Sequence, residues 1–193
     1  MKKFILLLLF FVSLTSFSQI LNPVKWEFGA EKLSDNEYEL IFVAKIDLHW
    51  SLYSQFVEEG GPLPTLFSFE LSTDFELFES VVESETNKVT QLDPVFEMVV
   101  SKYYDKAIFK QRVRVKSPDF RLIGNIDFMT CDDTKCTYKP DNPFTFQYTA
   151  ESGFSIVGGS PMLESEISEN ANVVLYGMTQ NTLQKATSNC SVQ

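Results

Sequence analysis

Residues 106–116, KAIFKQRVRVK, decide the fold class because apolar and basic side chains alternate along them. Ala107, Phe109 and Val113 fall on one side of an extended chain, and the lysines and arginines fall on the other. A period of two is typical of a β-strand with one buried face and one solvated face. We therefore expect a strand here, with its basic face in water.

The same alternation recurs along most of the chain. In residues 36–46, NEYELIFVAKI, every second residue from Tyr38 to Ile46 is apolar. Clusters of Gly, Pro, Asn, Asp and Ser separate such runs, and these residues favour turns. Seven to nine short strands without a long helix predict an all-β fold, an immunoglobulin-like antiparallel β-sandwich. The other strand candidates are residues 24–30, 66–71, 74–82, 95–104, 121–129 and 144–150.

The amino terminus has the parts of a secretory signal peptide. Lys2 and Lys3 precede an apolar run that is shorter than the roughly 20 residues of a membrane span, and Ser16 and Ser18 follow it. We expect cleavage after Ser18, which leaves 193 − 18 = 175 residues in the periplasm or outside the cell. No cysteine follows the apolar core, so a lipid anchor is not expected.

The mature chain is acidic. Its formal net charge of −10 becomes −12 once Lys2 and Lys3 leave with the signal peptide. Such a surface repels nucleic acid and anionic lipid head groups, so neither is expected as a partner. No later apolar segment approaches membrane-spanning length, so the mature protein is not expected to insert into a membrane.

Composition changes near residue 150 and divides the chain. Residues 151–193 are rich in Ser, Asn, Glu and Gly, and their apolar residues are scattered except at 173–176. The sequence therefore predicts a sandwich domain over residues 19–150. It predicts a largely disordered polar tail over residues 151–193, with room for one marginal helix or strand.

Two of the three cysteines lie in residues 128–140, FMTCDDTKCTYKP, with four residues between them. A turn could bring Cys131 and Cys136 within the Cα separation of roughly 4.4–6.8 Å that a disulfide requires. Closing a loop of about six residues stabilises a fold by roughly 2 kcal/mol, whereas joining Cys131 to Cys190 contributes roughly 4 kcal/mol. A short loop is a weak cross-link for a domain that already has a core, which favours a redox role. A purely structural hairpin disulfide stays open as the alternative.

Charged neighbours bear on the chemistry of the pair. Asp132 and Asp133 disfavour a thiolate at Cys131. Lys135 favours a thiolate at Cys136. Such a pair is better suited to attack by a partner's thiolate than to acting as a strong nucleophile, unless the three charges are simply solvated turn residues. With one histidine and no second cysteine pair, four zinc ligands are hard to assemble, and no metal is expected.

Residues 128–140 resemble the active-site hairpin of a known family, the amino-terminal periplasmic domain of DsbD, the thiol:disulfide interchange protein. LHWSLYSQF (48–56) resembles the aromatic strand of that family, and KYYDKAIFKQRVRV (102–115) resembles its cap-loop hairpin. With NPVKWEF at the mature start, the similarity covers roughly residues 22–150. The cysteine hairpin is its most specific part.

The resemblance implies an immunoglobulin-like domain that relays electrons through Cys131 and Cys136 without a cofactor. In that family the pair accepts electrons from a thioredoxin-like domain that a membrane-embedded domain feeds. It then reduces periplasmic thioredoxin-fold proteins, among them disulfide isomerases and a protein of cytochrome c biogenesis. The resemblance also implies that Cys136 forms the mixed disulfide with partners and that the chain acts as a protein-disulfide reductase.

An aromatic cap over the disulfide is a further implication of the resemblance. Tyr103 or Tyr104, followed by Asp105, provides it, and Tyr53 lines the same end of the sandwich. A ring over a disulfide excludes small thiols and must move before a partner can react. The alternative for Tyr103 and Tyr104 is ordinary strand packing.

The chain departs from the family in two ways. Its hairpin holds four residues between the cysteines, one fewer than in the best-known members. The family's membrane and thioredoxin-like domains are missing, so a separate membrane protein is expected to donate electrons, unless the chain acts outside that circuit or is a truncated remnant.

Cys190 has no counterpart and is either a free thiol or a link to another chain. Trp50 is expected in the core, and His49 in a strand rather than in acid–base catalysis.

Two functions from different classes therefore stay open. The first is a periplasmic thiol–disulfide relay domain that exchanges through Cys131 and Cys136. The second is a secreted β-sandwich module that binds a glycan or a protein, with a disulfide that is only structural. A capped, partly accessible disulfide at one end of the sandwich favours the first. An exposed aromatic platform far from the hairpin favours the second.

Overall fold

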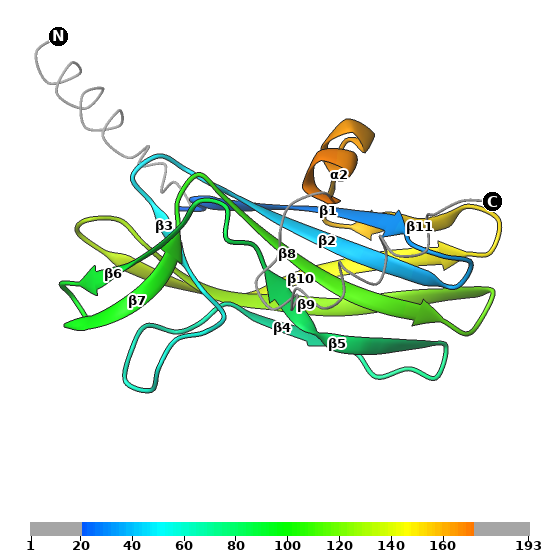
Figure 1. The fold of residues 1–193 in the computed structure, drawn as a ribbon, viewed down its shortest axis with the longest axis horizontal. Coiled ribbons are helices and arrows are strands. Elements are labelled where there is room, and N and C mark those ends of the chain that lie inside the picture. Colours follow the sequence, from blue (N-terminus) through cyan, green and yellow to red (C-terminus); the bar gives the residue numbers. More distant parts are fainter. Residues whose placement is uncertain (1–20, 172–193) are drawn as a thin grey trace, which may run out of the picture.

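The computed structural model describes residues 21–171. The predicted signal peptide (residues 1–18) and residues 172–193 of the predicted tail lie outside this range. Two sheets pack face to face (Figure 1), which confirms the predicted all-β sandwich. The first sheet contains, in spatial order, β12 (Ser160–Pro161), β1 (Val24–Lys32), β2 (Glu37–Ile46), β8 (Lys106–Val115) and β5 (Phe75–Glu83). The second contains β11 (Gly153–Gly158), β10 (Cys136–Thr149), β9 (Asp119–Cys131), β3 (Ser51–Tyr53), β7 (Met98–Tyr103) and β6 (Lys88–Asp93), and β4 (Leu66–Phe69) also pairs with β9.

Aromatic side chains fill the space between the sheets. In β8, Ala107, Phe109 and Val113 are fully buried, as the period of two predicts. Phe42 of β2 lies with its ring centroid 5.0 Å from those of Phe67 and Phe144. Such pairs contribute roughly 0.5–1.5 kcal/mol each beyond the area that they bury. Aromatic contacts therefore connect strands of the two sheets.

The opposite face of β8 is drier than its sequence predicts. Lys110 is only 2% exposed, and its ammonium group lies 2.9 Å from the carboxylate of Glu39. Ile108 on the same face packs with Ile41 and Val43 in a second, smaller apolar cluster. The alternation predicts that this face is solvated, but side chains cover it. Two of them, Met162 and Ile167, come from beyond the predicted domain.

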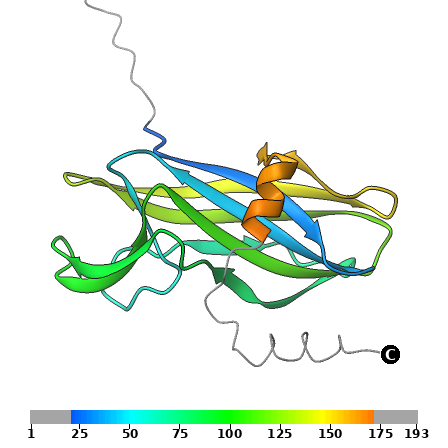
Figure 2. The same cartoon turned by 45° about the horizontal axis from the view of Figure 1, so that its top comes forward.

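The sandwich continues past residue 150, where the sequence predicts the start of the polar tail. β11 pairs with β10, and β12 pairs in parallel with β1. Helix α2 (Glu164–Ala171) then lies over the first sheet (Figure 2), where Ile167 packs on the smaller cluster. Gly29 permits this close approach, because a Cβ atom there would lie 2.9 Å from Ile167 Cγ1. The predicted boundary at residue 150 is therefore too early, since strand pairing orders a segment whose composition is that of a tail.

Three connections gather at one end of the sandwich (Figure 1): the β9–β10 turn, the β6–β7 hairpin and the loop from β3 to β4. The β1–β2, β8–β9 and β10–β11 turns lie at the other end. Over residues 21–171, the structure contains no helix with the length and apolar character needed to cross a membrane.

Candidate functional site

A disulfide closes the β9–β10 hairpin. Cys131 ends β9 and Cys136 begins β10, and the two residues lie directly opposite each other in the antiparallel register. Their sulfur atoms are bonded, and their Cα atoms lie 4.1 Å apart, near the spacing of about 4.5 Å for a non-hydrogen-bonded antiparallel pair. The hairpin thus positions both cysteines by ordinary strand pairing, as the sequence predicts.

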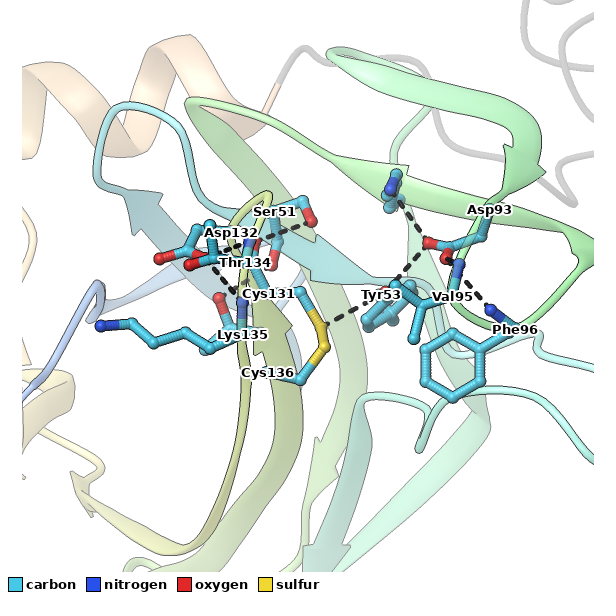
Figure 3. Close-up of a disulfide and its surroundings, with 12 residues drawn as sticks. Ser51, Tyr53, Asp93, Val95, Phe96, Cys131, Asp132, Thr134, Lys135 and Cys136 are labelled. Carbon is cyan, nitrogen blue, oxygen red and sulfur yellow. Dashed lines mark hydrogen bonds and ion pairs between the residues drawn. A yellow bond between two sulfur atoms is a disulfide. The ribbon is translucent and has the colours of Figure 1, made fainter.

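Asp132 shapes the turn between the cysteines (Figure 3). Its Oδ1 atom accepts hydrogen bonds from the backbone N–H groups of Thr134 and Lys135, at 2.7 and 2.8 Å. These bonds, with one from the Thr134 hydroxyl, lower the pKa of Asp132. Lys135 lies with its ammonium group 5.8 Å from the centre of the Trp50 ring. Asp132 and Lys135 therefore have structural roles in the turn in addition to their charge.

The two cysteines differ in accessibility. Cys131 is only 6% exposed, whereas Cys136 is exposed. In the strand register Ser51 lies opposite Cys131 and Leu52 opposite Thr130. Because Leu52 and Thr130 are fully buried and belong to the inner face, Cys131 points to the outer face of the second sheet. It packs there in a small separate cluster with buried Tyr53 and Val100 and partly buried Val57, Phe96, Met98 and Met129.

Tyr53 connects the disulfide to a buried ion pair. Its hydroxyl has one proton, which can be donated to Asp93 Oδ2 at 3.1 Å or to Cys131 Sγ at 3.4 Å (Figure 3). The ammonium group of Lys102 lies 3.1 Å from the same Asp93 oxygen. Burial, together with the charge of Asp93, raises the pKa of Tyr53, so its hydroxyl keeps its proton. Tyr53 is therefore a permanent donor that faces one of the two sulfur atoms.

Asp93 also holds the turn that carries Phe96. Burial disfavours its charged form, but hydrogen bonds from the Val95 N–H group and from Lys102 outweigh burial and lower the pKa of Asp93. Its Oδ1 atom accepts from the backbone N–H groups of Val95, at 2.9 Å, and Phe96, at 3.4 Å. The Phe96 ring packs edge-on against the Tyr53 ring at 6.1 Å. One carboxylate thus links the β6–β7 turn to the tyrosine that faces the disulfide.

Of the two tyrosines proposed as a cap from the sequence, Tyr103 lies elsewhere. Tyr103 is fully buried in the main core, and its hydroxyl donates to the Ser84 carbonyl at 2.7 Å. It is paired with inward-facing Leu52, so strand parity turns it away from the outer face. Tyr104 is partly exposed, and its ring centre lies 6.0 Å from the ammonium group of Lys102. It lies near the Tyr53 network, and its role as a cap stays a prediction.

Asp105 and His49 are turn residues. Asp105 is exposed with a φ of 63°, and its carbonyl accepts from the Ile46 N–H group at 2.8 Å. His49 is also exposed, and its φ of 70° shows a left-handed turn before β3 rather than the strand position that the sequence predicts.

Trp50 is buried in the main core, as expected. No group of three or more His, Cys, Asp or Glu side chains within residues 21–171 is arranged to hold a metal ion.

Sequence reasoning missed Phe96 and Asp93. Asp93-Pro94 reads as a turn signal, and residues 95–104 read as a less regular strand. Neither pattern shows that the turn folds back over Tyr53. An Asp two residues before a backbone N–H donor is typical of an Asx turn, and this is the one local signal that could have indicated the role of Asp93.

These features define a two-sheet β-sandwich with an unequally buried disulfide at one end. No family model and no curated protein matches the sequence. Among solved structures, the chain is similar to the N-terminal periplasmic domain of ScsB from Proteus mirabilis, with a TM-score of 0.48 and 14% identity over 72% of this chain and 52% of that one. The chain therefore spans about half the length of that ScsB chain.

Two further solved structures are similar to a lower degree. One is the DsbD n-terminal domain of Neisseria meningitidis in the reduced form, with a TM-score of 0.44 and 11% identity over 73% of this chain and 96% of that one. The other is the full-length major pilin SpaD of Corynebacterium diphtheriae, with a TM-score of 0.34 and 13% identity over 64% and 34%. Scores this low assign neither a family nor a function. The function proposed below therefore rests on the geometry of the site.

Proposed function

We propose that this chain is an extracytoplasmic thiol–disulfide exchange domain. It passes electrons to or from thioredoxin-fold proteins through Cys131 and Cys136, and a separate membrane protein is the source of electrons. The observation that carries this proposal is the inequality of the two cysteines: Cys136 is exposed, and Cys131 is buried against the hydroxyl of Tyr53.

The inequality determines which sulfur reacts. Exchange requires a thiolate to approach one sulfur of the disulfide while the other departs. A partner's thiolate reaches exposed Cys136, forms a bond to its sulfur and breaks the Cys131–Cys136 bond. Cys131 departs as a thiolate within reach of the Tyr53 proton, and a hydrogen bond to a charged group is among the stronger ones.

The second step completes the transfer. The partner's second thiolate attacks the partner's own sulfur in the mixed disulfide, which releases Cys136 as a thiolate. Cys131 and Cys136 each take up a proton as their pKa values require. Two electrons and two protons have then moved from the partner dithiol to this chain, and the reverse sequence transfers them back.

The hairpin can open without loss of the fold. β9 and β10 remain paired as far as Asp119 and Thr149, at the opposite end of the sandwich. The disulfide closes a loop of only about six residues and stabilises the fold by roughly 2 kcal/mol. Reduction therefore changes the sulfur atoms and their immediate neighbours more than the sandwich.

Trapping with single-cysteine variants tests the proposal. Both variants also carry Cys190→Ser, so that Cys131→Ala leaves only exposed Cys136 and Cys136→Ala leaves only buried Cys131. Each variant is mixed with a thioredoxin that keeps only its attacking cysteine, activated as a thionitrobenzoate mixed disulfide, and the release of thionitrobenzoate is followed by absorbance. We expect Cys131→Ala to form the protein–protein disulfide at least about tenfold faster, because only its thiol is accessible.

The reduction potential of the wild-type disulfide provides the second measurement. A value above about −300 mV is expected of an exchange centre, since inert structural disulfides lie below it. A lower value, with no adduct from either variant, refutes the proposal.

The alternative of a glycan- or protein-binding module needs an exposed aromatic platform away from the hairpin. Within residues 21–171 the exposed aromatic side chains are Phe56, at 61%, and Tyr138, at 45%. Tyr138 follows Cys136 by two residues on β10, and Phe56 lies in the loop after β3 at the same end of the sandwich. Both therefore belong to the surroundings of the disulfide.

A further inference from the structure

We infer that the surface around Cys136 is a docking face for a thiol protein whose reactive cysteine is surrounded by cationic side chains. This inference rests on the proposed exchange function and adds the charge of the partner. It follows from three features of the face, namely an apolar centre, an acidic rim and an excess of rim carboxylates over nearby lysines.

The centre of the docking face is apolar. Cys136 is exposed, and Tyr138 shares its side of β10 because the two residues are two positions apart. Met129 lies opposite Tyr138 in the register and is partly exposed, as are Val57 and Phe96 of the cluster around Cys131. An apolar centre around the reacting atom is the usual core of a protein–protein interface.

The rim of the face is acidic, and three separate segments contribute to it. Asp132 and Asp133 belong to the turn between the cysteines. Glu97 follows Phe96 in the β6–β7 turn and is exposed. Glu58 and Glu59 follow Val57 in the β3–β4 loop and are exposed.

Packing of the β3–β4 loop on β7 brings two of these segments together. A Cβ atom at Gly61 would lie 2.8 Å from both Met98 Sδ and Val57 Cγ1, so the loop lies directly on the start of β7. Val57 and Met98 both pack on the cluster that contains Cys131. Glu58 and Glu97, their neighbours in the chain, therefore lie at the border of that cluster.

Nearby lysines offset this charge only in part, because the five rim carboxylates face the two positive charges of Lys135 and Lys139. Lys102 is buried against Asp93 at 3.1 Å. Lys135 lies over the Trp50 ring, and the ammonium group of Lys139 donates to the Leu21 carbonyl. The charge of Lys135 acts on neighbouring Asp132, whereas none of the salt bridges within residues 21–171 includes Glu58, Glu59 or Glu97.

The charge of the rim selects the occupant. An attacking thiolate is itself negative, so an acidic rim slows the approach of small anionic thiols to Cys136. A protein that surrounds its thiolate with lysines or arginines meets attraction instead, and complementary charge raises association rates by 10-fold or more at low ionic strength. The face thereby discriminates among thiol partners by charge as well as by shape.

Capped pentapeptides test the inference with defined probes. Lys-Lys-Cys-Lys-Lys, Gly-Gly-Cys-Gly-Gly and Glu-Glu-Cys-Glu-Glu, each with blocked termini, are used to open the disulfide of the full mature chain. Rates are expressed per thiolate and corrected for nucleophilicity with a Brønsted coefficient of about 0.4–0.5, which together remove the effect of differences in thiol pKa. At about 10 mM ionic strength we expect the cationic peptide to react at least about tenfold faster than the anionic one, and the ratio should fall towards about two near 1 M salt.

Matched variants locate the effect. A rim variant combines Glu58→Gln, Glu59→Gln, Glu97→Gln and Asp133→Asn and retains Asp132, whose side chain shapes the turn. A control variant removes four carboxylates away from the disulfide by Glu31→Gln, Asp35→Asn, Glu70→Gln and Glu151→Gln. The rim variant should bring the cationic-to-anionic ratio within about twofold, and the control should keep most of the wild-type ratio. Circular dichroism checks that both are folded.

The outcomes separate the two proposals. If all three peptides open the disulfide at equal rates per thiolate, or if the control variant loses the ratio as the rim variant does, the inference fails and the exchange function stands. If none of the peptides opens the disulfide in the folded chain, the exchange function itself fails.

Discussion

Removal of one hydroxyl group isolates the chemical role of Tyr53. Tyr53→Phe keeps the ring that packs against Phe96 and deletes the oxygen that lies 3.4 Å from Cys131 Sγ and 3.1 Å from Asp93 Oδ2. The substitution keeps the ring and nearly all of its volume. Loosening of the Phe96 turn would speed disulfide opening, so slower opening reports on the hydrogen bond to sulfur.

The expected magnitude follows from the charge on the departing sulfur. A hydrogen bond to a fully charged group contributes about 1.5–3 kcal/mol. We assign roughly half a charge to Cys131 in the transition state, comparable to the Brønsted coefficient of about 0.4–0.5 for thiol–disulfide exchange. The hydroxyl then stabilises the transition state by about 1 kcal/mol, so Tyr53→Phe should open roughly fivefold more slowly. Loss of the bond to Asp93 should also lower the free energy of unfolding by about 2 kcal/mol.

Rapid quenching with an alkylating agent, followed by mass spectrometry, measures the opening rate in dithiothreitol. Tyr104→Phe is the matched control, because the Tyr104 hydroxyl accepts only a 3.4 Å hydrogen bond from the Gln91 side chain. It should open within about twofold of the wild-type rate. If Tyr53→Phe loses stability in urea but opens as fast as Tyr104→Phe, the hydroxyl is purely structural and the reasoning is refuted.

Three further predictions concern the surroundings of the site. Phe96→Ala should lower the free energy of unfolding by about 1–2 kcal/mol and speed the reaction of the disulfide with 2-mercaptoethanol about threefold. The control Val95→Ala removes an exposed side chain and should change neither quantity. Equal reaction rates for the two variants would contradict a shielding role of Phe96. Because the pKa of Asp93 is lower in the folded chain than in the unfolded chain, its carboxylate stabilises the fold at pH values above the unfolded pKa of about 3.9. This stability is lost as the pH falls through the folded-state pKa. The free energy of unfolding of Asp93→Asn, measured in urea, should therefore depend less on pH below about 4 than that of the wild type. Parallel pH profiles would count against this. Gly29→Val should displace α2, remove the hydrogen-exchange protection of the α2 amides and lower the free energy of unfolding by about 1–3 kcal/mol. The reduction potential of the disulfide, which lies on the other sheet, should not change. Retained protection would show that α2 can shift to make room for the larger side chain.

Short-range patterns predicted most of the sandwich. Alternation in residues 36–46 and 106–116 corresponds to β2 and β8, because alternation of side-chain direction is a property of the extended chain itself. The pairing of Cys131 with Cys136 was equally local, since a four-residue turn leaves few other arrangements. Both features depend on residues that are close together in the sequence.

Long-range placement explains the errors. Tyr103 and Tyr104 have similar surroundings in sequence, but pairing of β7 with β3 buries Tyr103 in the main core. Residues 153–158 have the composition of a tail, yet they form a strand because they pair with β10. In each case the deciding neighbour lies on another strand, so no local pattern in the sequence contains it.

The sequence by itself determined the fold class and the identity of the sulfur pair, because alternation and loop length act over a few residues. Only the tertiary structure decided that Cys131 is buried and Cys136 exposed, and that Tyr53, Asp93 and Phe96 surround them. The physical reason is that burial and hydrogen bonding depend on which face of a sheet a side chain occupies and on which distant turn folds over that face.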